Sequence, residues 1–218
     1  MTQPDAATDP TLRAALHFFD EAVLLTRYHR TGGTTSYPVA PQEVAATLGA
    51  QPLSTGLLPR HTLFWRREQG GECLGLYVPR RRWAVRTTEH TYQIPLPPLL
   101  LVGWHTRLYA YALKRVPRGP EERLFHFPGS NLYADGTVCM GDTPLPACSS
   151  ATIYTLRDLF LTGSAFNDHG IRARCRSYPE DVRALWAALA EKTRFPLGEL
   201  LPTAYTLGDW SEGRLRPA

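Results

Sequence analysis

The sequence predicts an α+β fold in which C-terminal helices pack on an antiparallel β-meander, preceded by a β-rich N-terminal extension. Three observations lead to this class. Short segments of strand-like pattern follow one another through the first half of the chain, two segments with helical spacing of apolar residues come after them, and the two kinds do not alternate. The length of 218 residues suits one domain, or one domain with an extension.

The composition is that of an ordinary globular protein, with 43% hydrophobic and 20% charged residues, which excludes a disordered, a collagenous and a disulfide-scaffold chain. The longest apolar run, residues 94–103, contains three prolines and falls short of the ~18 residues that a membrane span needs, so we expect no membrane partner. The net charge of +4 is too small by itself to indicate nucleic-acid binding. The first residues lack the basic and apolar regions of a signal peptide, which predicts a cytoplasmic protein.

The N-terminal region is expected to form strands. Residues 1–10 are polar, contain two prolines and predict a flexible tail. Residues 14–19 and 22–28 resemble two strands around a polar turn, although a single helix is the competing interpretation. Pro41 at the first position, with an acidic residue in the first turn, predicts a short helix that ends near Gly49.

A run of strands begins near residue 61. Its members are residues 62–66, 74–78, 82–86, 99–102 and 108–113. A Gln-Gly-Gly turn at residues 69–71 would join the first two as a hairpin. Arg80, Arg82 and Arg86 would share one strand face, which we interpret as a solvated face. The alternatives are an acidic partner protein or a DNA-associated module that binds phosphates there, but we do not expect nucleic acid as a partner.

Two amphipathic helices follow the strands. The first has apolar residues at helical spacing between Ile153 and Phe160 and ends at Gly163. The second begins after Pro179 and places four apolar residues on one face. These four are Val182, Leu185, Trp186 and Leu189. We expect this face to pack against the other helix or the sheet.

An irregular segment, residues 124–141, separates the last strand from the first of these helices and contains the candidates for chemistry. A cysteine on a loop can be solvent-accessible, and a nearby side-chain amide can donate a hydrogen bond to an oxyanion. Cys139 and Asn131 are these two residues, and Asp135-Gly136 predicts a tight turn that folds the chain back between them. This combination suits acyl transfer through a thioester.

The other three cysteines lack such a setting. No CxxC pair occurs and no histidine stands at zinc-ligand spacing, so we expect free thiols and no metal. Cys175 stands among three arginines, which could lower the pKa of its thiol, and we expect it at the surface without a function.

The irregular segment resembles the active site of the ubiquitin-conjugating enzymes, in which an asparagine is followed by a glycine five residues later and a cysteine eight residues later. Asn131, Gly136 and Cys139 match this spacing, and the order of meander, loop and helices matches as well. In more detail, residues 83–196 resemble the prokaryotic branch called PRTRC system protein B. The matching residues are Phe127, Pro128, Asn131, Tyr133, Asp135, Gly136, Val138, Cys139, Gly141, Phe166 and Asn167.

The resemblance implies a site around Cys139. Asn131 would stabilise the oxyanion. Asp168 or His169 would orient and deprotonate the attacking amine from the gateway segment, residues 163–170, which follows the first helix. The binding surface beside them would be formed by Tyr133, Asp135, Gly136 and Asn167. Helix capping and loop solvation are an equally good account of the gateway residues.

One departure from the family leaves two arrangements open. Gly129 and Ser130 separate Pro128 from Asn131, whereas the family has proline directly before asparagine. The amide then either faces the sulfur from a bulged loop, or it has moved and another donor, such as a backbone N–H near Met140, serves the oxyanion.

The resemblance also implies a function. The protein would be a ubiquitin-conjugating-enzyme-like protein that accepts a ubiquitin-like modifier as a thioester on Cys139 from a ThiF-like activating enzyme. It would pass the modifier to an acceptor and would need no cofactor. A JAB-type metalloprotease and ParB-like proteins of the same plasmid or phage cassette are further implied partners. The alternative is a catalytically inactive scaffold of the same fold that binds the modifier or the activating enzyme. We expect an extension at residues 11–82, the conjugating core at 83–200 and a C-terminal tail at 201–218.

Overall fold

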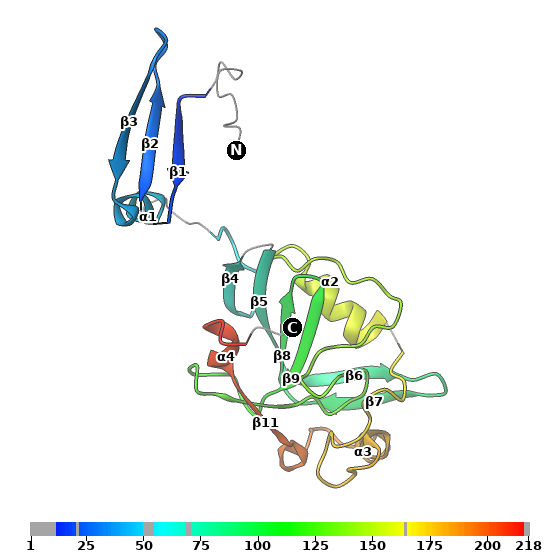
Figure 1. Cartoon of the computed structure of the whole chain (residues 1–218). Helices are drawn as coiled ribbons and strands as arrows, with labels where there is room; N and C mark the ends of the chain where they lie inside the picture. Colours follow the sequence, from blue (N-terminus) through cyan, green and yellow to red (C-terminus); the bar gives the residue numbers. More distant parts are fainter. Residues whose placement is uncertain (1–11, 21, 50–54, 69–70, 164, 216–218) are drawn as a thin grey trace. The chain divides into compact units, whose positions relative to one another are not determined.

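The computed structural model describes residues 12–20, 22–49, 55–68, 71–163 and 165–215. The chain divides into two compact units, residues 1–56 and residues 57–218 (Figure 1). The flexible tail expected at residues 1–10 lies outside the described residues.

The first unit is a three-stranded antiparallel sheet with one helix after it. In order across the sheet, the strands are β1 (Ala14–Phe18), β2 (Val23–Tyr28) and β3 (Thr34–Val39). Helix α1 (Pro41–Gly49) follows, so the predicted strands and the predicted helix are both confirmed. This sheet buries few side chains: within the described part of this unit, the buried residues are Val23 and Thr26.

The second unit is built on a curled six-stranded antiparallel sheet (Figure 1). Across the sheet, the strands are β11 (Pro202–Thr206), β10 (Arg123–His126), β9 (Arg107–Ala112), β8 (Leu99–Trp104), β5 (Gly71–Val78) and β4 (Thr62–Glu68). Strands β5 and β8 are neighbours because the chain between them forms a separate hairpin of β6 (Arg81–Arg86) and β7 (Thr91–Leu96). The expected α+β class is therefore confirmed, and the expected strands form. One of them, residues 82–86, does not join the meander, because β6 pairs with β7 in the separate hairpin.

More of the chain is structured than the sequence pattern indicates. Residues 124–126, at the start of the segment that we expect to be irregular, belong to β10. Strands β4 and β5, in the range 11–82 that we expect to be an extension, pair within the sheet of the second unit. The range 201–218, for which we expect a tail, contains edge strand β11 and helix α4 (Leu207–Ser211). Proline has no backbone N–H to donate to a neighbouring strand, so a strand that starts with proline fits best at the edge of a sheet.

Both faces of the sheet are covered, which explains the apolar run in β8. Leu99 and Leu101 belong to the cluster that includes the second unit's longer helices, whereas Leu100 and Val102 pack on the opposite side with Trp210 of α4. Successive side chains of a strand point to opposite faces, so a strand buried on both sides is apolar at every position.

Two helical segments complete the larger cluster. Helix α2 (Ile153–Asp158) continues into a π-helical turn, η2 (Leu159–Gly163), and ends at the predicted glycine. Helix α3 (Val182–Leu189) is capped by Asp181, whose side chain accepts a hydrogen bond from the backbone N–H of Arg183. A short 3-10 turn, η3 (Leu197–Glu199), precedes β11.

The apolar face of α3 packs as predicted. Its four apolar residues are buried, and the ring of Trp186 contacts Tyr92 of β7 and Phe166. The indole N–H of Trp186 donates to the carbonyl of Pro128 at 2.9 Å, which ties α3 to the start of the cysteine-containing loop. No helix among the described residues is long and apolar enough to cross a membrane.

Candidate active site

The loop that contains Cys139 folds back on itself as the Asp-Gly pair predicts. The backbone N–H of Gly136 donates to the carbonyl of Tyr133 at 3.1 Å, and the Asp135 carboxylate accepts from the backbone N–H of Thr137 at 2.9 Å. Gly136 has a φ of 92°, and a Cβ there would lie 2.7 Å from the Tyr111 ring. Glycine is needed because the turn has a left-handed backbone and presses against an aromatic ring.

The returning arm of this loop is fixed to the edge of β9. The backbone N–H of Val138 donates to the carbonyl of Leu108 at 2.8 Å, and that of Ala110 donates to the carbonyl of Gly136 at 2.9 Å. Strand β10 pairs only with the last residues of β9, so the loop occupies the part of the edge that β10 leaves open. The position of Cys139 is therefore set by the sheet.

Cys139 differs from the other cysteines in its exposure. Its side chain is partly exposed, whereas Cys73, Cys148 and Cys175 are buried. Burial raises the pKa of the Cys73 thiol to about 11 and that of Cys148 to about 12. These two thiols are protonated near neutral pH and cannot act as nucleophiles.

The prediction of a surface position for Cys175 is wrong. The side chain is fully buried, its thiol donates to the carbonyl of Tyr178 at 3.3 Å, and burial raises its pKa. The arginines beside it in the sequence do not lower the pKa. Burial raises it most, and the negative charges of Glu199 and Asp181 raise it further.

The sulfur of Cys139 has a hydrogen-bond donor at hand. The hydroxyl of Tyr133 donates to it over 3.8 Å, and this contact raises the pKa of the phenol. Tyr133 therefore keeps its proton and its capacity to donate throughout the neutral range. The ring of Tyr133 packs edge-on against that of His169, with 4.7 Å between the centroids, so three residues from two loops form one cluster.

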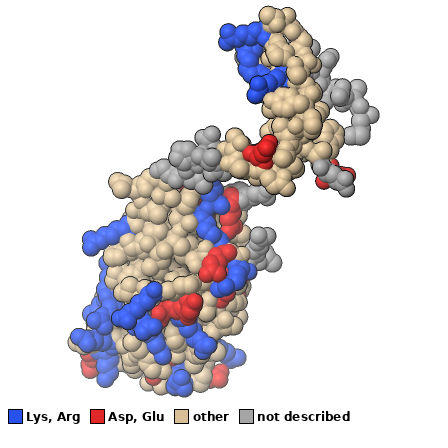
Figure 2. All heavy atoms as spheres, turned by 90° about the vertical axis from the view of Figure 1, so that its left-hand side faces the viewer, with Lys and Arg blue, Asp and Glu red and all other residues tan. Residues whose placement is uncertain are grey.

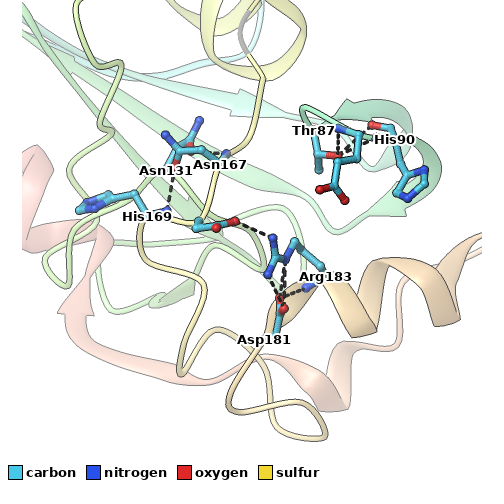
Figure 3. A network of polar contacts seen from close by, with 9 residues as sticks. Thr87, His90, Asn131, Asn167, His169, Asp181 and Arg183 are labelled. Atoms are coloured by element: carbon cyan, nitrogen blue, oxygen red, sulfur yellow. Dashed lines mark hydrogen bonds and ion pairs between the residues drawn. The ribbon is translucent and has the colours of Figure 1, made fainter.

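Asn131 holds the two loops together. Its Nδ2 donates to the carbonyl of Ala165 at 3.0 Å. Its Oδ1 accepts from the backbone N–H of Asn167 at 2.9 Å (Figure 3). Its backbone carbonyl accepts from the N–H of Cys139 at 2.8 Å. The residue is buried and has a left-handed φ of 60°. The amide is thus directed at the gateway segment, while the main chain of Asn131 contacts the cysteine.

The gateway residues are divided between two sides of their segment. Asn167 Oδ1 accepts from the backbone N–H of His169 at 2.8 Å and stabilises the turn. The carboxylate of Asp168 is largely exposed and pairs with Arg183 at 2.5 Å, while the His169 side chain extends away from Arg183 (Figure 3). The Nε2 of His169 is buried without a hydrogen-bond partner among the described residues. The structure brings His169, but not Asp168, to the Tyr133 side.

A buried arginine that the sequence analysis missed supports this arrangement. Arg174 donates to the carbonyls of Leu132 at 2.7 Å, Tyr133 at 3.1 Å and Gly170 at 2.8 Å. It is 4% exposed, and burial lowers its pKa. Three arginines alternate with other residues at positions 172–176, and nothing in that pattern distinguishes the buried one. Within the described residues, no group of three or more His, Cys, Asp or Glu side chains could hold a metal ion.

Comparison with known proteins identifies the family. Residues 42–203 match the family model described as prokaryotic E2 family D. No match is found among curated proteins or among solved structures. The matched range contains the cysteine loop, the gateway segment and the helices that hold them, and an E2-like family suggests a role in the conjugation of a ubiquitin-like modifier. Because the match spans most of the chain, the chain belongs to prokaryotic E2 family D.

Proposed function

We propose that this protein is a conjugating enzyme that carries a ubiquitin-like modifier as a thioester on Cys139, between a ThiF-like activating enzyme and an acceptor. The observation that carries the proposal is the setting of the Cys139 sulfur. It is partly exposed, stands on a loop fixed to β9 and lies within reach of the Tyr133 hydroxyl. A thiol that must be reached by a bulky partner needs both access and a fixed position.

The reaction is an acyl transfer in two steps. In loading, the Cys139 sulfur attacks the thioester carbonyl of the activated modifier; a new C–S bond forms, the old C–S bond breaks, and the proton of Cys139 leaves with the departing thiol. In discharge, an acceptor amine attacks the same carbonyl, a C–N bond forms, the bond to Cys139 breaks, and the amine proton passes to a base or to water. No cofactor takes part in either step.

Several residues would serve these steps. The Tyr133 hydroxyl would stabilise negative charge on the sulfur when it attacks and when it leaves. Asn131 would hold the gateway segment against the cysteine loop, and its second amide hydrogen would be available for the oxyanion. His169, beside Tyr133, would accept the amine proton. Asp168 would act on the other side of the segment, where its ion pair with Arg183 holds the segment to α3.

Tyr133, Asp135, Gly136 and Asn167 would form the surface that receives the modifier. We further propose the finer relationship to PRTRC system protein B, with a JAB-type metalloprotease and ParB-like proteins encoded nearby and action in the cytoplasm. A gene neighbourhood with these partners would support this assignment.

Thioester formation is the direct test. Purified protein is mixed with ATP and with the ThiF-like enzyme and ubiquitin-like protein of the same genome. We expect a modifier-sized adduct that thiol reductant removes, that becomes a reductant-stable ester or is lost in Cys139→Ser, and that is absent in Cys139→Ala. An adduct that persists in Cys139→Ala would overturn the proposal, as would one lost only in Cys148→Ala or Cys175→Ala.

A catalytically inactive scaffold that binds the modifier or the activating enzyme is the second candidate. Two observations favour it: the Asn131 amide is engaged by the gateway segment, and the Asp168 carboxylate is paired with Arg183. A scaffold would bind the modifier or the activating enzyme with equal affinity in wild type and in Cys139→Ala, and neither protein would form the adduct.

A further inference from the structure

A hollow of about 370 Å³ opens on the surface of the second unit. Four separate segments line it, and none of them belongs to the cysteine loop. The first segment is the turn before β6 with the first two residues of that strand, and the second is the end of β7 with the turn that follows it. Lys114, just after β9, and the chain after α3 complete the lining. Its basic lining residues are Arg80, Arg81, Arg82, Lys114 and Arg194. Prolines and Leu197 contribute apolar walls, and no carboxylate lines it among the described residues.

The positive charge of this hollow is not compensated. Elsewhere in the described chain, many arginines have an acidic partner within ion-pair distance. They are Arg66, Arg67, Arg115, Arg157, Arg172, Arg183 and Arg214. On the face of the second unit in Figure 2, acidic side chains accordingly lie beside basic ones. None of the five cations of the hollow forms such a pair with a described residue, so a concave surface of one sign remains.

Three of the five head groups are held in position without losing their charge. The Arg81 guanidinium stacks on the Trp83 ring at 3.6 Å, and the Lys114 ammonium lies 4.7 Å from the centre of the Phe125 ring. Arg82 donates to the carbonyl of Ala190 at 2.8 Å and so ties the end of α3 to β6. Contacts with a ring face leave the N–H donors at the edge of a guanidinium available to a ligand.

The other two cations have no such role. Arg80 and Arg194 are exposed, and neither makes a hydrogen bond or ion pair with a described residue. Clustering of like charges costs free energy, and a negatively charged ligand removes that cost when it binds.

We propose that this hollow binds an acidic segment of a partner protein. Carboxylates of the segment would pair with Arg80, Arg81 and Arg194, and an apolar side chain between them would lie against Leu197 and the prolines. The apolar walls favour a peptide, whose apolar side chains can pack on them, over a nucleic acid, whose affinity comes mainly from contacts to phosphates. The proposal does not depend on thioester formation.

Binding of a defined peptide tests it. The probe is a fluorescently labelled peptide in which glutamates flank a single leucine, and the control peptide has glutamine at each glutamate. Anisotropy at low salt should show binding of the acidic peptide alone, with affinity that falls as salt is added. We expect the double variant Arg80→Glu/Arg194→Glu to weaken binding by about tenfold or more.

The matched control is Arg67→Glu/Arg172→Glu, which makes the same change in net charge at two exposed arginines that do not line the hollow. This control should bind the peptide within about twofold of wild type. Equal losses in both double variants would reduce the effect to net charge and overturn the proposal. Tighter binding of a single-stranded oligonucleotide of equal charge, lost in Arg80→Glu/Arg194→Glu, would also overturn it and assign the hollow to nucleic acid.

Discussion

The hydroxyl of Tyr133 lies 3.8 Å from the sulfur of Cys139, on the opposite arm of a turn whose arms are joined by a bridge between Leu132 and Val138. The donor is therefore placed by backbone hydrogen bonds before any partner arrives. Such a preorganised donor costs no rearrangement during the reaction, which is the condition under which a hydrogen bond stabilises developing charge most.

Tyr133→Phe should slow transfer while leaving the fold intact. The change removes the hydroxyl and keeps the ring that packs against His169. Because the contact to sulfur is long, we expect single-turnover loading and discharge to fall by about tenfold, below the range for a short oxyanion donor. The control is Tyr154→Phe, which removes a hydroxyl that donates to the Arg60 carbonyl. Equal rates in wild type and Tyr133→Phe would show that the hydroxyl takes no part.

Asn131→Ala should destabilise the protein and slow discharge. The change leaves the Ala165 carbonyl and the Asn167 N–H without their partner and places alanine at a φ of 60°. We expect a loss of about 2–4 kcal/mol in urea unfolding. Per folded molecule, loading should persist while discharge to an amine falls ~10²-fold or more. If folded Asn131→Ala discharged at the wild-type rate, the amide would only hold the two loops together and would take no part in the transfer.

Local patterns predict the elements of this fold well and their partners poorly. Trp186 and its neighbours on α3 follow helical spacing, and Asp135-Gly136 has the chemistry of one turn type, so both are predictable from adjacent residues. Strand β11 has no such signal, because its pairing with β10 joins segments about eighty residues apart in the sequence. An edge strand that begins with proline resembles a tail until its partner is known.

The candidate site shows the same division. The spacing from Asn131 to Cys139 indicates a thioester site, but the direction of the Asn131 amide depends on Ala165 and Asn167, which only folding brings near. Likewise, Arg174 and Cys175 lie in an arginine-rich stretch that predicts exposure, and both are buried. An arginine can be buried only when several acceptors bind its N–H groups. For Arg174, the carbonyls of Leu132 and Tyr133 do so, and they belong to a loop that is distant in the sequence.

Gly136→Ala should cost more stability than Gly141→Ala, although both glycines have positive φ. At Gly136 the new Cβ would meet the Tyr111 ring at 2.7 Å, whereas nothing lies within 4 Å of a Cβ at Gly141. We expect a loss of about 2–3 kcal/mol at Gly136, from strain and overlap together, and about 1 kcal/mol at Gly141 from strain alone. Chemical unfolding of the two variants measures the difference, and equal losses would mean that the loop moves away from β9.

The stabilising effect of Asp181 should depend on pH. Hydrogen bonds from Arg183 hold the pKa of this carboxyl below its ordinary value of 3.8. A depressed folded pKa contributes stability that is present above the unfolded pKa and is lost as the pH falls through the folded value. Asp181→Ala should therefore cost about 1 kcal/mol at neutral pH, mainly through the lost helix cap, and much less at about pH 2. A cost that does not change with pH would exclude the charged cap as its source.

Trp186 should matter to the fold and not to the chemistry. Its ring is buried among Tyr92 and Phe166, so Trp186→Ala should lower stability by about 3–5 kcal/mol. Trp186→Phe keeps an aromatic ring but leaves the Pro128 carbonyl without the indole donor, for which we expect about 1–2 kcal/mol. Urea unfolding measures both losses. Because the hydrogen bond from Trp186 to the cysteine loop ends at Pro128, three residues before Asn131, the folded fraction of Trp186→Phe should load modifier on Cys139 at the wild-type rate. A slower rate in fully folded Trp186→Phe, together with slower labelling of Cys139 by a thiol reagent, would show instead that α3 determines the geometry of the loop.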